Sequence, residues 1–137
     1  MTQPFSELTR DLTLNRDAPI SAVRSALAAL DVSPPDDYVA FLARSNGAEG
    51  PIGTSGYLVL WPIEQLKPLN DAYHVAEFAP SLVLFGSDGG DVAYAFDRRA
   101  AGRMVAVPFI GMRDDDAHIL GASFAEFVDR IAKGAAS

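Results

Sequence analysis

The segment 82–97 (LVLFGSDGGDVAYAFD) constrains the fold of this chain more than any other stretch of it. Two apolar runs flank residues 87–91, whose glycines reach positive φ without strain and whose aspartates can bond nearby backbone amides. After this turn, Val92, Tyr94 and Phe96 fall on one face of an extended strand, and the residues between them fall on the other. The segment therefore predicts a β-hairpin.

Patterns typical of helices and strands lie on both sides of this hairpin. Ser21 is placed to cap a helix whose apolar stripe begins at Ile20, and Ser123 and Glu126 form a capping box. Pro68 is expected to interrupt or kink a short helix. In chain order we expect helix 21–30, helix 34–46, loop 48–56, strand 57–61, a short helix from 62, the hairpin, turn 98–102, strand 104–109 and helix 123–134. This order predicts an α+β fold with N-terminal helices, a central antiparallel sheet and a C-terminal helix.

The domain organisation is expected to be simple, because no repeat or linker divides the chain. A single domain is predicted over 19–137, preceded by a partly ordered arm at 1–18. No apolar run approaches the roughly 20 residues that span a bilayer, and the first residues lack the apolar stretch of a signal peptide. The chain has no cysteine, which excludes disulfides and thiolate chemistry, so the cytoplasm is the expected location.

The net charge of −7 narrows the class of partner. Binding to a phosphate backbone requires clustered lysine and arginine, so nucleic acid is not an expected partner. An acidic surface keeps a protein soluble, and it also attracts basic partners. The charge therefore favours a basic protein as the partner, or indicates solubility alone.

No group of residues has the spacing of an active site, so no catalytic, cofactor-binding or metal-binding residue is predicted. Ser87 and the histidines His74 and His118 could in principle form a nucleophilic triad, but Ser87 lacks the G-x-S-x-G context. The run 114–116 (DDD) offers oxygen ligands, but it lacks the alternating spacing of a calcium loop. We interpret that run as a solvated loop and the histidines as ordinary surface or partly buried residues.

The aromatic residues in strand-like or apolar runs are expected to belong mainly to the core. Any that lie outside the core would be anchors at a partner surface. The residues concerned are Tyr57, Trp61, Tyr73 and Tyr94.

Several segments, taken in order over about residues 20–132, resemble the SUKH superfamily in its Smi/Knr-like branch. The resemblance is carried by PPDDYVAFL (34–42) with SNG (45–47), YLVLWP (57–62), GSDGG (86–90) with AYAFD (93–97), VPF (107–109) and SFAEF (123–127). Where the family often has G-G-G-E, this chain has GGDV at 89–92, so the acid of that turn is displaced by one residue.

The resemblance implies a protein-binding domain without enzymatic activity. Bacterial members commonly neutralise a toxin, often a nuclease, and an acidic immunity protein can be steered to the basic surface of such an enzyme. Two alternatives remain open: a regulatory module of the same fold with a cellular protein partner, and a small hydrolase. The residues predicted to form the partner-binding surface are Glu49, Asp88, Asp91, Asp97, Asp114, Asp115 and Asp116.

Overall fold

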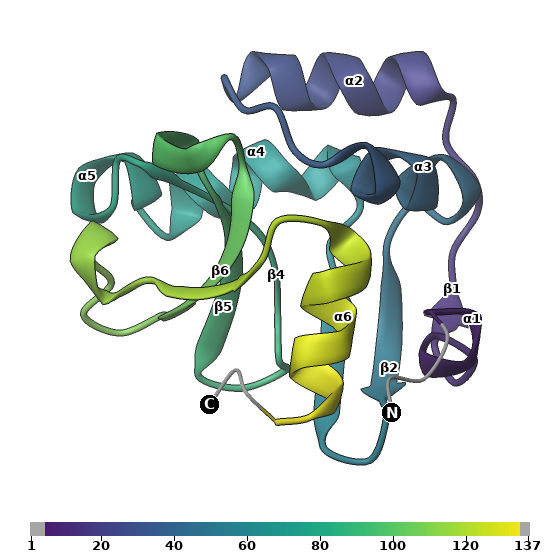
Figure 1. The fold of residues 1–137 in the computed structure, drawn as a ribbon. Helices are drawn as coiled ribbons and strands as arrows, with labels where there is room; N and C mark the ends of the chain where they lie inside the picture. The colour runs from purple at the N-terminus through teal and green to yellow at the C-terminus, as the bar shows by residue number, and fades with distance from the viewer. Residues whose placement is uncertain (1–4, 135–137) are drawn as a thin grey trace.

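The structure is a computed structural model that describes residues 5–134 (Figure 1). Its elements are α1 (Phe5–Leu8), β1 (Thr13–Leu14), α2 (Ile20–Ala29), α3 (Asp36–Arg44), β2 (Ala48–Ile52), β3 (Gly56–Leu60), α4 (Ile63–Ala72), α5 (Val75–Phe78), β4 (Leu82–Ser87), β5 (Val92–Asp97), η1 (Arg98–Ala100), β6 (Arg103–Pro108), η2 (Asp114–Asp116), β7 (His118–Gly121) and α6 (Phe124–Ala132). The predicted α+β fold, with N-terminal helices, an antiparallel sheet and a C-terminal helix, is confirmed.

The seven strands form one antiparallel sheet in which each strand pairs with the next one along the chain. The predicted hairpin consists of β4 and β5, with Leu82 opposite Asp97 and Ser87 opposite Ala93. Every residue of β4 is buried, and so is every residue of β5 after Val92. The hairpin is therefore enclosed on both faces, which explains why neither of its strands alternates apolar with polar residues.

Helix α6 packs an aromatic core against one face of the sheet. The helix contacts β2, β3 and β7 and lies in the foreground of Figure 1. The ring of Phe85 lies 4.4 Å from that of Phe96 and 5.3 Å from that of Phe127, and Tyr38 lies 4.8 Å from Phe96. Stacked and edge-to-face pairs of this kind stabilise a core beyond the area that they bury. The hairpin, α3 and α6 thus share one core.

The first turn of α6 is capped from two directions. Ser123 Oγ accepts a hydrogen bond from Glu126 N at 3.1 Å, as the capping box predicts. The carboxylate of Asp37, in α3, accepts from Phe124 N at 2.8 Å and from Ala125 N at 3.0 Å. These bonds satisfy amides that have no partner inside the helix. Asp37 therefore connects the start of α3 to the start of α6.

The prediction of a loop over 48–56 is wrong, because its first five residues form β2. The glycine and proline of that stretch led to the prediction, and the structure accommodates both. A side chain at Gly50 would lie 2.8 Å from Asp11 O, so glycine allows the arm to approach β2 closely. Pro51 lies beyond the end of β1, where β2 is locally an edge strand and tolerates proline.

Two helix predictions also need correction. Helix α4 continues through Pro68 to Ala72, and because Pro68 is exposed, water can reach the carbonyl of Glu64 that the proline leaves without a donor. Ser21 does not cap α2, which begins at Ile20 and has no side-chain cap. Ile20 is half-exposed, so the apolar stripe of α2 starts one turn later than predicted.

Two short strands, β1 and β7, have no counterpart in the sequence prediction. Strand β1 lies in the segment 1–18, of which residues 1–4 lie outside the described part of the chain, and Leu8 and Leu12 of that segment are buried. Strand β7 pairs with β6 at one edge of the sheet and contacts α6. Within residues 5–134, no helix has the length and apolar character needed to cross a membrane.

Candidate functional site

The seven acidic residues identified from the sequence lie at two ends of the β4–β5 hairpin. Strand β5 runs for six extended residues from the end of the turn to Asp97, its last residue, a span of about 20 Å. The turn-end acids are Glu49, Asp88 and Asp91, and the base-end acids are Asp97, Asp114, Asp115 and Asp116. The acids therefore form two groups, which can be considered separately.

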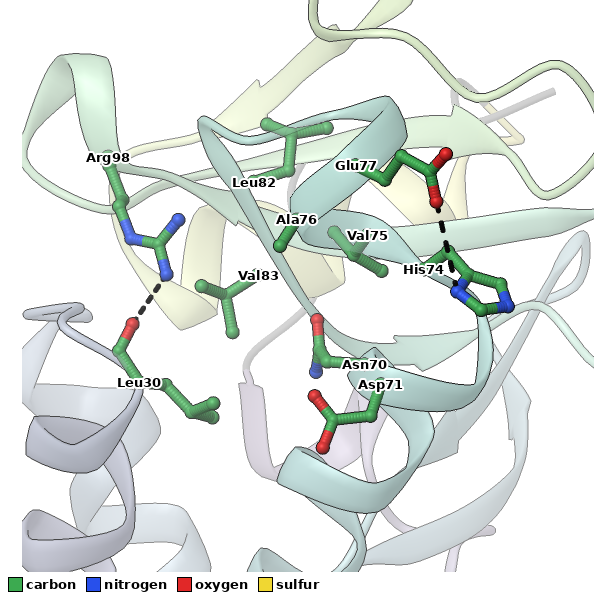
Figure 2. A pocket seen from close by; sticks show the side chains of 10 residues that line it. All are labelled: Leu30, Asn70, Asp71, His74, Val75, Ala76, Glu77, Leu82, Val83 and Arg98. Atoms are coloured by element: carbon green, nitrogen blue, oxygen red, sulfur yellow. Dashed lines mark hydrogen bonds and ion pairs between the residues drawn. The ribbon is translucent and has the colours of Figure 1, made fainter.

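Beside the base end, residues of α4, α5 and β4 and the end of α2 line a pocket of about 290 Å³, shown in Figure 2. Arg98 lies on one side of it, where Nη1 donates to Pro80 O at 2.7 Å and Nη2 donates to Leu30 O. His74 and Glu77 lie on the other side, 4.0 Å apart and both largely exposed. Arg98 bonds backbone carbonyls after α2 and before β4, so it connects these two segments. We therefore interpret the pocket as a structural contact between α2 and β4 and not as a binding site.

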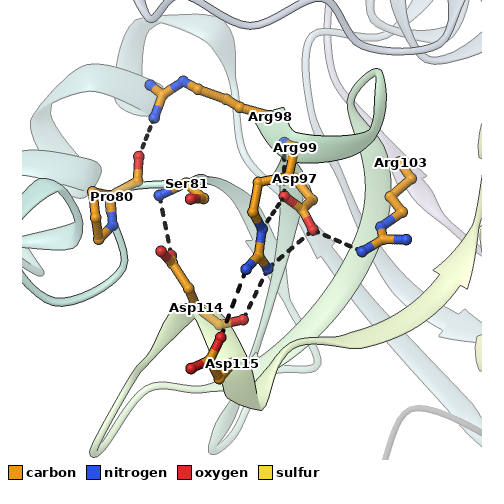
Figure 3. A network of polar contacts seen from close by, with 8 residues as sticks. All are labelled: Pro80, Ser81, Asp97, Arg98, Arg99, Arg103, Asp114 and Asp115. Atoms are coloured by element: carbon orange, nitrogen blue, oxygen red, sulfur yellow. Dashed lines mark hydrogen bonds and ion pairs between the residues drawn. The ribbon is translucent and has the colours of Figure 1, made fainter.

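Three of the four base-end acids, Asp97, Asp114 and Asp115, take part in a network of polar contacts (Figure 3). The carboxylate of Asp97 accepts from Arg99 Nε at 3.0 Å and from Arg103 Nη2 at 3.1 Å. Arg99 also donates from Nη2 to Asp114 O at 3.0 Å and lies 3.8 Å from the carboxylate of Asp115. This network attaches η2 to the end of β5.

Asp97 has a structural role in this network. Its side chain is 0% exposed. Burial alone would raise the pKa of Asp97, but hydrogen bonds from Arg99 and Arg103 outweigh burial and hold that pKa below its ordinary value. A carboxylate enclosed in this way does not lie on a surface that a partner can reach, so the placement of Asp97 on the partner surface is corrected.

The turn-end acids are arranged differently. Asp88 Oδ1 accepts from Gly90 N at 2.8 Å and from Val92 N at 3.2 Å, so this carboxylate shapes the turn, as the sequence indicates. Asp91 is exposed, and its carbonyl accepts from Phe109 N. Glu49 is exposed and accepts from Tyr57 Oη at 3.0 Å. Asp91 and Glu49 therefore present their charge to solvent.

Strands β2 and β3 leave one face of the sheet open beside this turn. Burial alternates along both strands, with the inner residues beneath α6 and the outer ones facing solvent. The register pairs Glu49 with Val59 and Pro51 with Tyr57, so these four side chains share the outer face. Antiparallel sheets commonly cover one face with a helix and leave the other to water. We call the surface formed by these four side chains the open face.

A groove of about 640 Å³ runs along the open face. Glu49 and Asp11 are the charged residues among those that line it, and none of the lining residues that the structure describes is basic. Arg10 lies 4.0 Å from Asp11, with both side chains largely exposed. The remaining lining residues are Thr13, Asn15, Ala48, Gly50, Pro51, Tyr57, Val59, Leu60, Trp61, Pro62 and Gln65. The groove thus combines aromatic, apolar and uncharged polar side chains with negative charge.

The hydrogen bond between Tyr57 and Glu49 has an electrostatic consequence. The neutral hydroxyl of Tyr57 donates to the carboxylate, and the negative charge of Glu49 disfavours a phenolate beside it. Chiefly through this hydrogen bond, the pKa of Tyr57 is raised above its ordinary value. Tyr57 therefore remains a neutral donor at neutral pH.

The residues considered for catalysis do not form a hydrogen-bonded triad. Ser87 Oγ accepts from Gly89 N at 3.1 Å, and within residues 5–134 no hydrogen bond joins Ser87 to His74 or His118. Over residues 5–134, no group of three or more histidine and acidic side chains is placed to hold a metal ion. The open face is consequently the candidate site with the clearest shape and charge.

Comparison with known protein families matches residues 18–130 to the model of the SMI1/KNR4 family (SUKH-1). The match covers most of the chain. The chain belongs to the SUKH-1 family. This confirms the resemblance carried by the sequence motifs, and the family includes immunity proteins. A search of curated proteins finds no match to the chain.

Two of the aromatic residues that the sequence places in the core, Tyr57 and Tyr73, are exposed in the structure. Trp61 and Tyr94 are buried as expected, whereas Tyr57 is 39% exposed and Tyr73 is 41% exposed. The alternation of GYLVL puts Tyr57 and Val59 on the face opposite Leu58 and is the signal that could have identified an outer face. Because β2 was not predicted as a strand, however, the sequence did not indicate which face of β3 the helix α6 would cover.

Proposed function

We propose that this SUKH-1 domain is an immunity protein that binds a toxin and covers its active surface, without catalysing a reaction itself. The observation that carries the proposal is the open face, which presents Tyr57 and Glu49 to solvent in a protein of a family that includes immunity proteins. The partner in this proposal is a basic protein domain in the cytoplasm, and neither nucleic acid nor a membrane takes part.

The charge of the chain supports this choice of partner. A nuclease binds polyphosphate with a surface of basic side chains. The net charge of −7 on this chain attracts that basic surface over long range. Glu49 lines the groove, and the turn that carries Asp88 and Asp91 packs against Tyr57 beside it, so association would be steered to the open face. Asp115 and Asp116 are exposed, whereas Asp114 is half-buried and accepts from Ser81 N at 3.0 Å. These three acids of η2 stay in the proposal as a secondary surface.

The experiment begins by sequencing the DNA on both sides of the gene, to find a large secreted protein with a basic C-terminal domain. That domain is purified, and its association with this chain is followed by stopped flow at low and high salt. The turn-end variant Glu49→Lys/Asp91→Lys should slow association roughly tenfold at low salt, and the effect should shrink as salt rises.

A matched control comes from exposed acids that belong to neither group. The variant Asp36→Lys/Glu77→Lys changes the net charge by the same amount away from both surfaces. Association that is slowed equally by both variants would show that total charge, rather than the open face, governs binding. Toxin inhibition that survives in both variants would overturn the electrostatic proposal. A cellular protein captured in place of a toxin would favour the regulatory alternative.

A further inference from the structure

The open face supports a more specific inference about what its partner must offer, which rests on the proposed function. We propose that Tyr57 and Glu49 together receive an arginine side chain of the partner protein. The guanidinium would bond to the carboxylate of Glu49 and stack on the ring of Tyr57. The contacts around these two residues lead to this assignment.

Glu49 has one carboxylate oxygen in use and one available. Tyr57 Oη donates to Glu49 Oε2 at 3.0 Å, and no other described residue donates to this carboxylate. An ionised carboxylate can accept about four hydrogen bonds, so acceptor positions remain on Oε1 and Oε2. The bond from Tyr57 fixes the carboxylate in place before the partner arrives, which reduces the entropy lost when a guanidinium binds.

The ring of Tyr57 is positioned by the hairpin turn. A side chain at Gly89 would lie 3.2 Å from Tyr57 Cδ2, so the turn approaches the ring closely at this point. Gly89 also has a φ of 84°, which a larger residue would adopt only with strain. Tyr57 nevertheless remains 39% exposed and lines the groove. A ring that is packed along one side and open along another provides a surface on which a planar cation can stack.

Arginine fits this pair better than lysine does. Guanidinium is planar, donates two parallel hydrogen bonds to a carboxylate and stacks on aromatic rings, whereas ammonium is a compact, strongly hydrated charge. The groove supplies the complementary charge, since its described charged residues are Asp11 and Glu49. Arg10 lies next to Asp11, whereas Glu49 forms no ion pair with any basic residue among those that the structure describes. The groove beyond Tyr57 leaves room for the backbone that carries the arginine.

The test is a ¹H–¹⁵N NMR titration of the full chain with the blocked peptide Gly-Gly-Arg-Gly-Gly and its lysine and citrulline counterparts. The arginine peptide should shift amide signals of β2, β3 and the turn. The lysine peptide should bind roughly threefold more weakly. Citrulline has nearly the same shape without the charge, so its peptide should not bind. Lysine binding as tight as arginine binding, or no shift on the open face, overturns the inference.

Variants separate the ring from the carboxylate. Tyr57→Ala and Glu49→Gln should each weaken the arginine peptide roughly three- to fivefold, because each removes one exposed contact of the cation. Tyr57→Phe keeps the ring and should retain most of the affinity. Glu77→Gln removes another exposed acid, on α5, and serves as the matched control. An effect of Glu77→Gln as large as that of Glu49→Gln would point to net charge and overturn the inference.

The peptide result and the toxin result can fail independently. If the peptide does not bind but Glu49→Lys/Asp91→Lys still slows toxin association, the arginine site is wrong and the proposed function stands. If the arginine peptide binds with the expected variant effects but no toxin associates with the chain, the proposed function is wrong and the arginine site stands.

Discussion

The two halves of the sheet differ in what covers them. The hairpin strands β4 and β5 and their neighbour β6 bury nearly all of their residues, so both faces of this half are enclosed. Strands β2 and β3 bury alternate residues and leave Glu49, Pro51 and Tyr57 exposed. One half of the sheet is therefore buried in the core on both faces, and the other half is buried on one face and exposed to solvent on the other.

This difference assigns separate physical roles to similar residue types. An acid in the enclosed half, Asp97, is held by two arginines and stabilises the fold. An acid in the open half, Glu49, contacts a single tyrosine and keeps acceptor positions for a partner. Substitutions in the enclosed half should thus change stability, and those in the open half should change binding.

The largest expected effect is that of Phe85→Ala in the enclosed half. The Phe85 ring is fully buried and lies between Tyr38, Phe96 and Phe127. Its removal should lower the free energy of unfolding by about 3–5 kcal/mol, measured by urea denaturation. Tyr57→Ala in the open half should leave the free energy of unfolding nearly unchanged. A similar loss in both variants would contradict the contrast between the two halves.

Asp97→Asn should have the next largest effect. The substitution keeps the shape of the side chain but removes the charge that Arg99 and Arg103 bond. Because both arginines are partly exposed and can be hydrated again, we expect a loss of about 2 kcal/mol in the free energy of unfolding. Glu49→Asn in the open half is the comparison, and its denaturation midpoint should stay close to that of the unaltered chain.

Asp97 should also make the free energy of unfolding depend on pH. The pKa of Asp97 is lowered in the folded protein, so the folded state binds its proton less readily than the unfolded state does. Its stabilising contribution is therefore complete above the ordinary aspartate pKa and is lost as the pH falls below roughly 4 through the lowered pKa. Asp97→Asn should flatten this part of the acid denaturation profile, and an unchanged profile would contradict the role given to Asp97.

Asp37→Ala should have an intermediate effect, because Asp37 caps α6 from outside that helix. Loss of its two bonds to Phe124 N and Ala125 N should lower the free energy of unfolding by about 1–2 kcal/mol. The neighbouring Asp36 is exposed, accepts no hydrogen bond from a described residue and provides the matched control as Asp36→Ala. Equal losses in the two variants would show that the charge at the start of α3, rather than the cap, is responsible.

The sequence predicted those parts of the fold that depend on local pattern. The hairpin and α6 follow from alternation, turn composition and the capping box, each of which acts within a few residues. Strand β2 could not be predicted in the same way, because Gly50 and Pro51 are tolerated only through the arm and the short length of β1. The arm and β1 lie more than 30 residues before β2 in the sequence, so a local pattern in β2 cannot reveal their effect.

The candidate site shows the same division. The acids were identified by their places in the hairpin and loops, but only tertiary structure separates Asp97, buried between two arginines, from Glu49 on the open face. Arg99 and Arg103 follow Asp97 closely in the sequence, yet nothing in their spacing fixes the direction in which that carboxylate points. Asp37 likewise matched a family motif, and its role as a cap appears only when α3 and α6 meet.

The smallest expected effect is that of Glu49→Gln on the titration of Tyr57. Removal of the carboxylate charge should lower the pKa of Tyr57 toward the ordinary value of tyrosine, since phenolate would no longer face an anion. The measurement is the difference in ultraviolet absorbance between the two proteins as the pH rises. Burial raises the pKa of Tyr38 and of Tyr94, so both should titrate later and separate from the signal of Tyr57. An unchanged Tyr57 pKa would mean that the bond to Glu49 does not persist in solution. The open face would then lack the preset carboxylate that distinguishes it from an ordinary exposed sheet.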